Sequence, residues 1–238
     1  LGPNHSFKPA FMWQATIEPL IPFAIRGVSW YQGESNAETA AKSREQAELF
    51  PLLIEKWREA WGQGDFPFLF VQLPALNRPA WPLFREVQRR VQQAVPNVSM
   101  AVSMDVGDPS NVHPRNKQPV GRRLAGLALG KTYSVQEESL YAGPTLSEVK
   151  REATAIVLKF EHAGVGLKSA DGRPLRHFEI AGADGKFFPA LSMIVGRDRV
   201  QVESKQVRNP QAVRYGWIPF PEPEVNFCNS VGVPASPF

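Results

Sequence analysis

The chain of 238 residues is poor in the residues that build disulfide scaffolds and metal centres. It has one cysteine, Cys228, so an internal disulfide and a thiolate metal cluster are both excluded. Its four histidines share no spacing typical of metal ligands, and we expect no metal site. Long hydrophobic runs are also missing: no stretch approaches the roughly 18 uncharged apolar residues of a membrane-spanning helix. We therefore expect no membrane partner.

Concentrated charge of one sign is absent as well. The 27 basic and 23 acidic residues give a net charge of +4, and the lysines and arginines are scattered along the chain. A protein that follows nucleic-acid phosphates needs a concentrated basic surface, so we expect no nucleic-acid partner. Hydrophobic residues make up 43% and charged residues 21%, which is the composition of a folded globular protein.

Strand and helix patterns alternate through residues 1–135. Short apolar runs predict strands at 24–30, 66–73 and 98–104. The run at 66–73 is continuous, as in strands buried on both faces. An amphipathic helix is predicted after each strand, and this alternation predicts an α/β domain with a parallel sheet.

The first predicted helix has a start signal and a break signal. Asn36 can cap its first turn. Leu49, Leu53 and Trp57 recur at four-residue spacing and predict the face turned to the core. Pro51 predicts a kink, or a division into two helices.

Residues 136–238 show a different period. Short apolar runs separated by turns rich in Gly and Asp predict a small β-rich module. We expect its C-terminal tail to return to the α/β domain. The predicted organisation is therefore two domains, 1–135 and 136–238.

Two polar segments follow predicted strands and could carry chemistry. The first is Trp-Tyr-Gln-Gly-Glu-Ser-Asn at 30–36, where N–H groups and the Gln32 amide could stabilise a developing negative charge. The alternative is a capped turn, in which Asn36 is the cap, Gly33 permits the tight geometry and Glu34 is solvated.

The second polar segment covers residues 105–117 and contains His113. Histidine is the usual general base beside a hydroxyl nucleophile, and Asp108 or Asp105 could orient its imidazole. The alternative is an ordinary surface histidine. Because carboxyl ends of parallel strands share one edge of a sheet, His113 and the Gln32–Gly33 turn are predicted to lie in one pocket there.

These segments resemble a known enzyme family. Residues 25–37 look like the hallmark block of sialate O-acetylesterases and related SGNH-type carbohydrate esterases, and 105–124 resemble their histidine block. Residues 65–73 and 232–238 are similar too. The resemblance implies a three-layer, flavodoxin-like α/β fold and hydrolysis of acetyl esters on sugars by a Ser-His(-Asp) mechanism without a cofactor.

The resemblance also implies roles for individual residues. His113 corresponds to the catalytic base. Gln32 and Gly33 look like oxyanion-hole residues, and Glu34 and Asn36 look like substrate-site or supporting residues. Many SGNH esterases place Asp three residues before the His, where this chain has Ser110. Asp108 is therefore the favoured acid, and a Ser-His dyad oriented by a backbone carbonyl is the alternative.

One family block is missing from this sequence. Family members begin with a GQS-type block whose Ser is the nucleophile, and no such block occurs in this chain. A parallel sheet that lacks its first strand exposes a hydrogen-bonding edge and an apolar face. We therefore expect that this chain is not a self-sufficient catalyst: either it packs against an upstream polypeptide fragment that carries the Ser, or it is stable only as an oligomer that buries the same edge. If the chain were active alone, the nucleophile would lie among residues such as Ser35 or Ser110.

The expected substrate is an acetylated sugar, sialic acid first. An acetylxylan-type esterase and a non-catalytic carbohydrate-binding protein on the same scaffold are the alternative functions. The resemblance implies a secreted, periplasmic or lysosome-like location.

Overall fold

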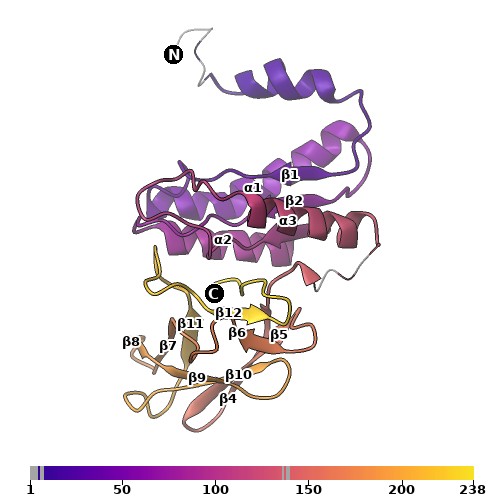
Figure 1. Ribbon diagram of the computed structural model, residues 1–238. Coiled ribbons are helices and arrows are strands. Elements are labelled where there is room, and N and C mark those ends of the chain that lie inside the picture. Colours follow the sequence, from indigo (N-terminus) through magenta and orange to yellow (C-terminus); the bar gives the residue numbers. More distant parts are fainter. Residues whose placement is uncertain (1–4, 6–7, 136, 138–139) are drawn as a thin grey trace.

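The computed structural model describes residues 5, 8–135, 137 and 140–238 (Figure 1). Its first part is built on three parallel strands in the order β1-β2-β3. Their bounds are β1 (Val28–Trp30), β2 (Phe68–Val71) and β3 (Val98–Ala101). Every residue of β2 and β3 is buried, as the apolar run at 66–73 predicted, whereas β1 is only half-buried.

Helices cover both faces of this sheet. They are α1 (Ala40–Trp61), α2 (Trp81–Ala94) and α3 (Gln118–Leu127), with short helical segments at Trp13–Ile17, Glu18–Leu20 and Ala128–Thr132. Helices α1 and α2 pack against each other and bury Phe68 and Phe70 of β2. Leu127 of α3 packs with Leu69 and Ala101, whose side chains lie in a separate cluster. The predicted three-layer α/β fold is confirmed.

Helix α1 begins later than the sequence predicted. Its N-cap is Thr39, whose hydroxyl accepts a hydrogen bond from the Lys42 N–H (3.2 Å). Asn36 instead lies in a turn closed by a bond from the Ala37 N–H to the Gly33 carbonyl (2.9 Å). The prediction that Asn36 caps this helix was wrong, because the chain stays non-helical until Thr39.

The buried face of α1 agrees with the prediction only in part. The helix runs unbroken through Pro51, so it is not divided in two, and its buried apolar residues are Phe50 and Ile54. Of the predicted stripe, Leu53 and Trp57 are partly buried and pack against the core, whereas Leu49 is 49% exposed. Both faces are apolar, so periodicity alone could not choose between them.

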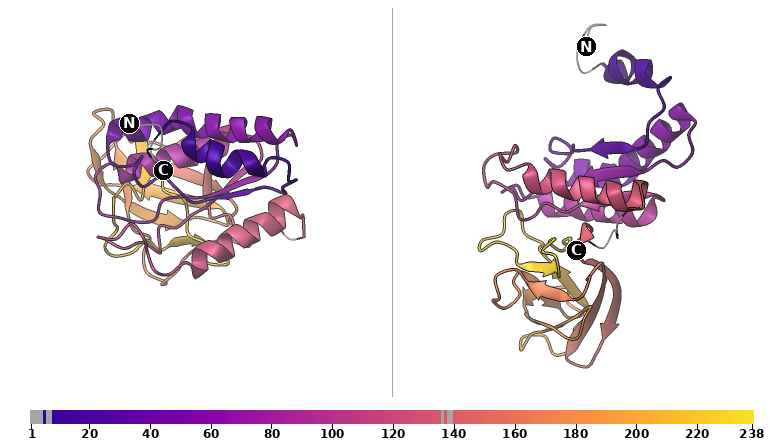
Figure 2. Two further views of the ribbon diagram at one scale, coloured as in Figure 1. Left: turned by 90° about the horizontal axis from the view of Figure 1, so that it is seen from above. Right: turned by 45° about the vertical axis from the view of Figure 1, so that its right-hand side comes forward.

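The second part of the chain is a set of antiparallel strands. They are β4 (Thr145–Arg151), β5 (Ala155–Glu161), β6 (Leu167–Ser169), β7 (Phe178–Ala181), β8 (Phe187–Pro189), β9 (Leu191–Ile194), β10 (Arg199–Glu203), β11 (Ala212–Tyr215) and β12 (Phe227–Asn229). They form the orders β4-β5-β10-β9, β11-β7-β8 and β12-β6. These strands lie together on one side of the α/β layers (Figure 2). The domain limits at 135 and 136 stay a prediction.

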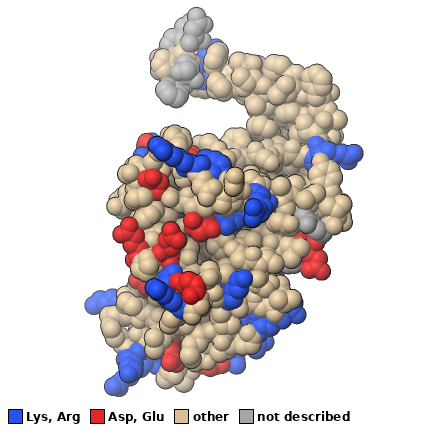
Figure 3. All heavy atoms as spheres, in the orientation of Figure 1, with Lys and Arg blue, Asp and Glu red and all other residues tan. Residues whose placement is uncertain are grey.

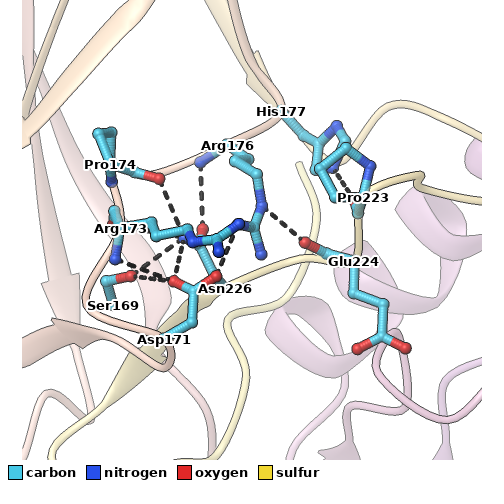
Figure 4. A network of polar contacts seen from close by, with 9 residues as sticks. All are labelled: Ser169, Asp171, Arg173, Pro174, Arg176, His177, Pro223, Glu224 and Asn226. Atoms are coloured by element: carbon cyan, nitrogen blue, oxygen red, sulfur yellow. Dashed lines mark hydrogen bonds and ion pairs between the residues drawn. The ribbon is translucent and has the colours of Figure 1, made fainter.

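A polar network in this β-rich part ties two distant segments together (Figure 4). Asp171 accepts hydrogen bonds from Asn226 Nδ2 (2.9 Å) and from Arg176 Nη1 (2.6 Å). These donors, Asn226 first, hold the pKa of the Asp171 carboxyl well below its usual range. The network fastens the loop after β6 to the segment before β12.

The C-terminal tail joins the β-rich part to the α/β part. Phe238 exchanges two backbone hydrogen bonds with Tyr215 (2.8 and 3.1 Å). Gln72 Nε2, just after β2, donates to Ser236 Oγ (3.2 Å). One hydrophobic cluster runs from the α1 and α2 face of the sheet into the β-rich part. Within the described part of the chain, no helix combines the length and hydrophobicity that crossing a membrane requires.

Candidate active site

The loop after β1 is shaped by a glycine that no other residue could replace without strain. Gly33 has φ of 144°, and a Cβ there would lie 2.5 Å from Cζ of Phe84. Beside it, Gln32 Nε2 donates to Asn36 Oδ1 (2.7 Å). The Gln32 amide donor is therefore engaged within its own loop in this structure, close to where an oxyanion hole was predicted.

The loop after β3 approaches this loop at the same edge of the sheet. Lys117 Nζ lies 3.4 Å from the Tyr31 hydroxyl and 4.6 Å from the centre of its ring. Val112 packs against the buried cluster that includes Ala37. Burial, and then the Glu34 carboxylate, raises the pKa of Tyr31 to about 12, so its hydroxyl is protonated at neutral pH. The structure thus brings the two predicted loops together.

His113 is exposed, and a series of hydrogen bonds within its own loop holds its backbone N–H. Asp108 Oδ1 accepts hydrogen bonds from the backbone N–H groups of Ser110 (2.9 Å) and Asn111 (2.8 Å). Asn111 Oδ1 in turn accepts from the His113 N–H (2.9 Å). The N–H donors at Ser110 and Asn111 hold the pKa of Asp108 below its ordinary value.

Asp108 therefore shapes the loop that carries His113. Among the described residues, no hydrogen bond joins its carboxylate to the His113 imidazole. Its predicted action as the acidic member of a triad stays a prediction.

The other candidate acid, Asp105, is engaged elsewhere. Arg123 of α3 binds it through two nitrogens (2.7 and 2.6 Å) and also donates to the Val102 carbonyl (2.7 Å). This bidentate pair fixes the start of the histidine loop to α3. Arg123 lies in the block that resembles the family, which is the signal that could have pointed to it.

An apolar groove lies beside β1, at the edge that a sheet without its first strand was expected to expose. A cavity of about 680 Å³ and a neighbouring one of about 510 Å³ share Trp30 and Trp57 in their walls. Gln32 and Asn36 line the larger cavity, but His113 does not. The remaining walls are mostly apolar, from α1 and from the N-terminal segment: Trp13, Ile17, Leu20, Phe23, Ile25, Leu49, Phe50, Leu52, Leu53 and Trp61. We call this pair of cavities the β1 groove.

The β1 groove lies along an open edge of the sheet. Strand β1 pairs with β2 on one side and has no strand partner on the other among the described residues. The N-terminal segment reaches out over this edge as an arm with few charged side chains on the face seen in Figure 3. Trp13 of the arm meets Trp57 edge-on at 5.8 Å.

The described residues contain no group of three or more His, Cys, Asp and Glu side chains placed to hold a metal ion. The two loops carry an exposed histidine, His113, and an amide side chain, Gln32, which donates within its own loop.

The chain is similar in sequence and in structure to known carbohydrate esterases. The chain is similar to sialate O-acetylesterases of Pongo abelii (29% identity) and Homo sapiens (28%), each match covering 100% of this chain. It also resembles the crystal structure of a carbohydrate acetylesterase from Xanthomonas citri, with 38% identity over 95% of this chain and a TM-score of 0.88. The chain spans 49% of the length of the two mammalian proteins and 53% of the bacterial one.

A family model covers the α/β part of the molecule. Residues 12–130, which include both candidate loops, match the model described as carbohydrate esterase, sialic acid-specific acetylesterase. The family resemblance noted in the sequence is therefore confirmed, and the chain belongs to the sialic acid-specific acetylesterase family of carbohydrate esterases.

Proposed function

We propose that this chain supplies the histidine side of the active site of a carbohydrate O-acetylesterase. The observation that carries the proposal is the contact between Lys117 and Tyr31, which brings the His113 loop beside the Gln32–Gly33 loop. A serine hydroxyl would attack the acetyl carbonyl while His113 takes its proton. His113 would then protonate the departing sugar oxygen, and water would release acetate by the same steps.

The other residues at this edge of the sheet would stabilise the negative charge that develops on the acetyl oxygen. The Gly33 backbone and the Gln32 amide would stabilise the tetrahedral oxyanion, with Glu34 and Asn36 holding their loop. Asp108 would act through the loop that it shapes. The mechanism as written uses no metal and no organic cofactor.

The serine is proposed to lie outside this chain, on an upstream polypeptide segment that covers the β1 groove. An unpaired strand edge and a large apolar patch are unfavourable in water, and another strand beside β1 would cover both. That the relatives are about twice as long as this chain supports the idea of a further segment. A secreted, periplasmic or lysosome-like location is proposed from the resemblance alone.

The proposal is tested by hydrolysis of an aryl acetate by the complete enzyme, with the upstream segment present. His113→Ala should lower kcat by about 10²- to 10⁴-fold, which is the usual contribution of a general base. Full activity in His113→Ala would remove this residue from the mechanism.

His177→Asn is the matched control. His177 lies in the β-rich part with φ of 62°, a left-handed conformation that Asn tolerates, and its ring contacts the Pro223 carbonyl. This variant should keep full activity. Sugar binding without any hydrolysis would favour the carbohydrate-binding alternative, and release of acetate from acetylated xylan but not from sialate esters would favour the acetylxylan-type esterase.

A further inference from the structure

Arg85 of α2 is a charged side chain buried completely and without an acidic partner. Its relative exposure is 0%, and within the described residues no carboxylate pairs with its guanidinium. Instead the group donates to the Met104 sulfur, to the Ile218 carbonyl and to the Pro219 carbonyl (3.3 Å). Burial lowers the pKa of Arg85 to about 9, so it stays charged at neutral pH. Placing a charge here is costly, which calls for a reason.

The carbonyls that Arg85 binds belong to the segment joining β11 to β12. The Pro219 carbonyl also accepts a hydrogen bond from the Leu76 N–H (3.1 Å), in the segment 74–77 that follows β2. The β-rich part and the α/β part therefore meet at this carbonyl, and Arg85 binds it from inside the core.

The segment 74–77 touches the histidine loop directly. The Ala75 carbonyl accepts from the Asp108 N–H (3.2 Å), and the Asn77 N–H donates to the Pro109 carbonyl (3.2 Å). The approach is so close that a Cβ on Gly107 would lie 2.1 Å from the Ala75 oxygen. From Asp108, the hydrogen bonds through Asn111 already described lead to the His113 backbone.

We propose that Arg85 is a positioning residue for His113, acting through the 218–219 segment and the 74–77 segment. The β-rich part would then help to place the catalytic loop. The inference rests on the proposed function for its catalytic consequence, but the mechanical coupling can be measured separately.

Arg58 offers a matched control at the other end of the sheet. It is also buried (8% exposed) and likewise binds backbone carbonyls, those of Phe66 (2.9 Å), Pro96 (2.9 Å) and Asn97 (3.2 Å). These carbonyls lie before β2 and β3, away from the histidine loop. Arg85→Met and Arg58→Met should both destabilise the protein, but only Arg85→Met should disturb the loop.

The experiment is amide hydrogen exchange and steady-state kinetics of the complete enzyme. In Arg85→Met, the Asp108 and Asn77 amides should exchange at least about tenfold faster than in the parent. The kcat for an aryl acetate should fall about ten- to a hundredfold, with KM changed less than about twofold, because a misplaced catalytic group slows the reaction more than binding. Arg58→Met should leave the exchange at these two amides and kcat near the parent values.

If Arg85→Met does not fold, a second variant tests the contact between the 74–77 segment and the histidine loop. Gly107→Ala forces the histidine loop away from Ala75 without touching Arg85, and should reproduce the same exchange and kinetic signature. Gly121→Ala, where a Cβ meets no atom within 4 Å, is its control. Unchanged exchange at Asp108 and Asn77 in Arg85→Met, or in Gly107→Ala where Arg85→Met does not fold, would overturn the inference. A complete enzyme without any esterase activity would instead overturn the proposed function.

Discussion

In the part of the chain that the structure describes, the acidic residues near His113 bind groups other than its imidazole. Asp108 accepts two N–H groups of its own loop, and Asp105 is bound by Arg123. A sequence pattern of Asp followed by His could not separate a triad acid from a loop-shaping acid, because both occupy the same segment. What distinguishes them is which atoms the carboxylate meets, and this depends on the fold.

Substitution of Asp108 separates the two roles. Asp108→Asn keeps an oxygen for the Ser110 and Asn111 N–H groups, so the complete enzyme should retain kcat within about tenfold. Asp108→Ala removes both contacts and should lower kcat further. A loss of about 10⁴-fold in Asp108→Asn, the size seen when a triad acid is made neutral, would show that Asp108 orients the imidazole directly. Steady-state kinetics with an aryl acetate makes this measurement.

Secondary-structure elements were predictable where the burial of apolar side chains alone determined them. The apolar run of β2 and the single apolar face of α2 correspond to buried elements, since burial alone decides them. Helix α1 was harder, because its apolar residues extend around more than one face: Phe50 and Ile54 are buried, whereas Leu49 and Leu52 are 49% and 46% exposed and line the β1 groove. The start of α1 depended on Thr39, a cap that lies only three residues beyond the equally suitable Asn36.

The outer face of α1 provides a test of the covered groove. Leu49 and Leu52 are 49% and 46% exposed and line the larger cavity. If another segment covers them in the complete protein, Leu49→Asp with Leu52→Asp should lower Tm by several degrees, because two charges would be buried unpaired. Leu191→Asp with Met193→Asp on β9, at positions 64% and 53% exposed, is the control and should change Tm little. Equal Tm values for the two double variants would argue that the β1 groove is open to water.

The network at Asp171 makes the β-rich part sensitive to acid. The hydrogen bonds of Asn226 and Arg176 lower the folded-state pKa of Asp171, so its stabilisation is present above the unfolded pKa of about 3.9 and is lost as the pH falls below it. Thermal unfolding between pH 3 and pH 7 should therefore show a smaller acid-induced drop in Tm for Asp171→Asn than for the parent. Asp184→Asn, at an exposed turn where Asp184 accepts the Lys186 N–H, should keep the parental drop. Equal drops for parent and Asp171→Asn would contradict this account.

At the scale of the whole molecule, the fold class followed from the sequence, but the particular side-chain contacts between its parts did not. Alternating strand and helix patterns predict a parallel sheet, because few topologies satisfy them. The contacts that join the parts run from side chains such as Arg85 and Gln72 to groups far away in the sequence. Backbone carbonyls accept most of these bonds, and every residue has one, so no sequence pattern marks them.

The central claim is that His113 serves a serine that lies outside these 238 residues. The direct measurement is to label the complete enzyme with a fluorophosphonate, which forms a covalent bond with an activated serine, and to identify the labelled peptide by mass spectrometry. The label should be found on a serine upstream of this chain, and its rate of incorporation should fall at least about a hundredfold in His113→Ala. A label on Ser35, Ser110 or any other serine of this chain, or an unchanged rate in His113→Ala, would contradict the account.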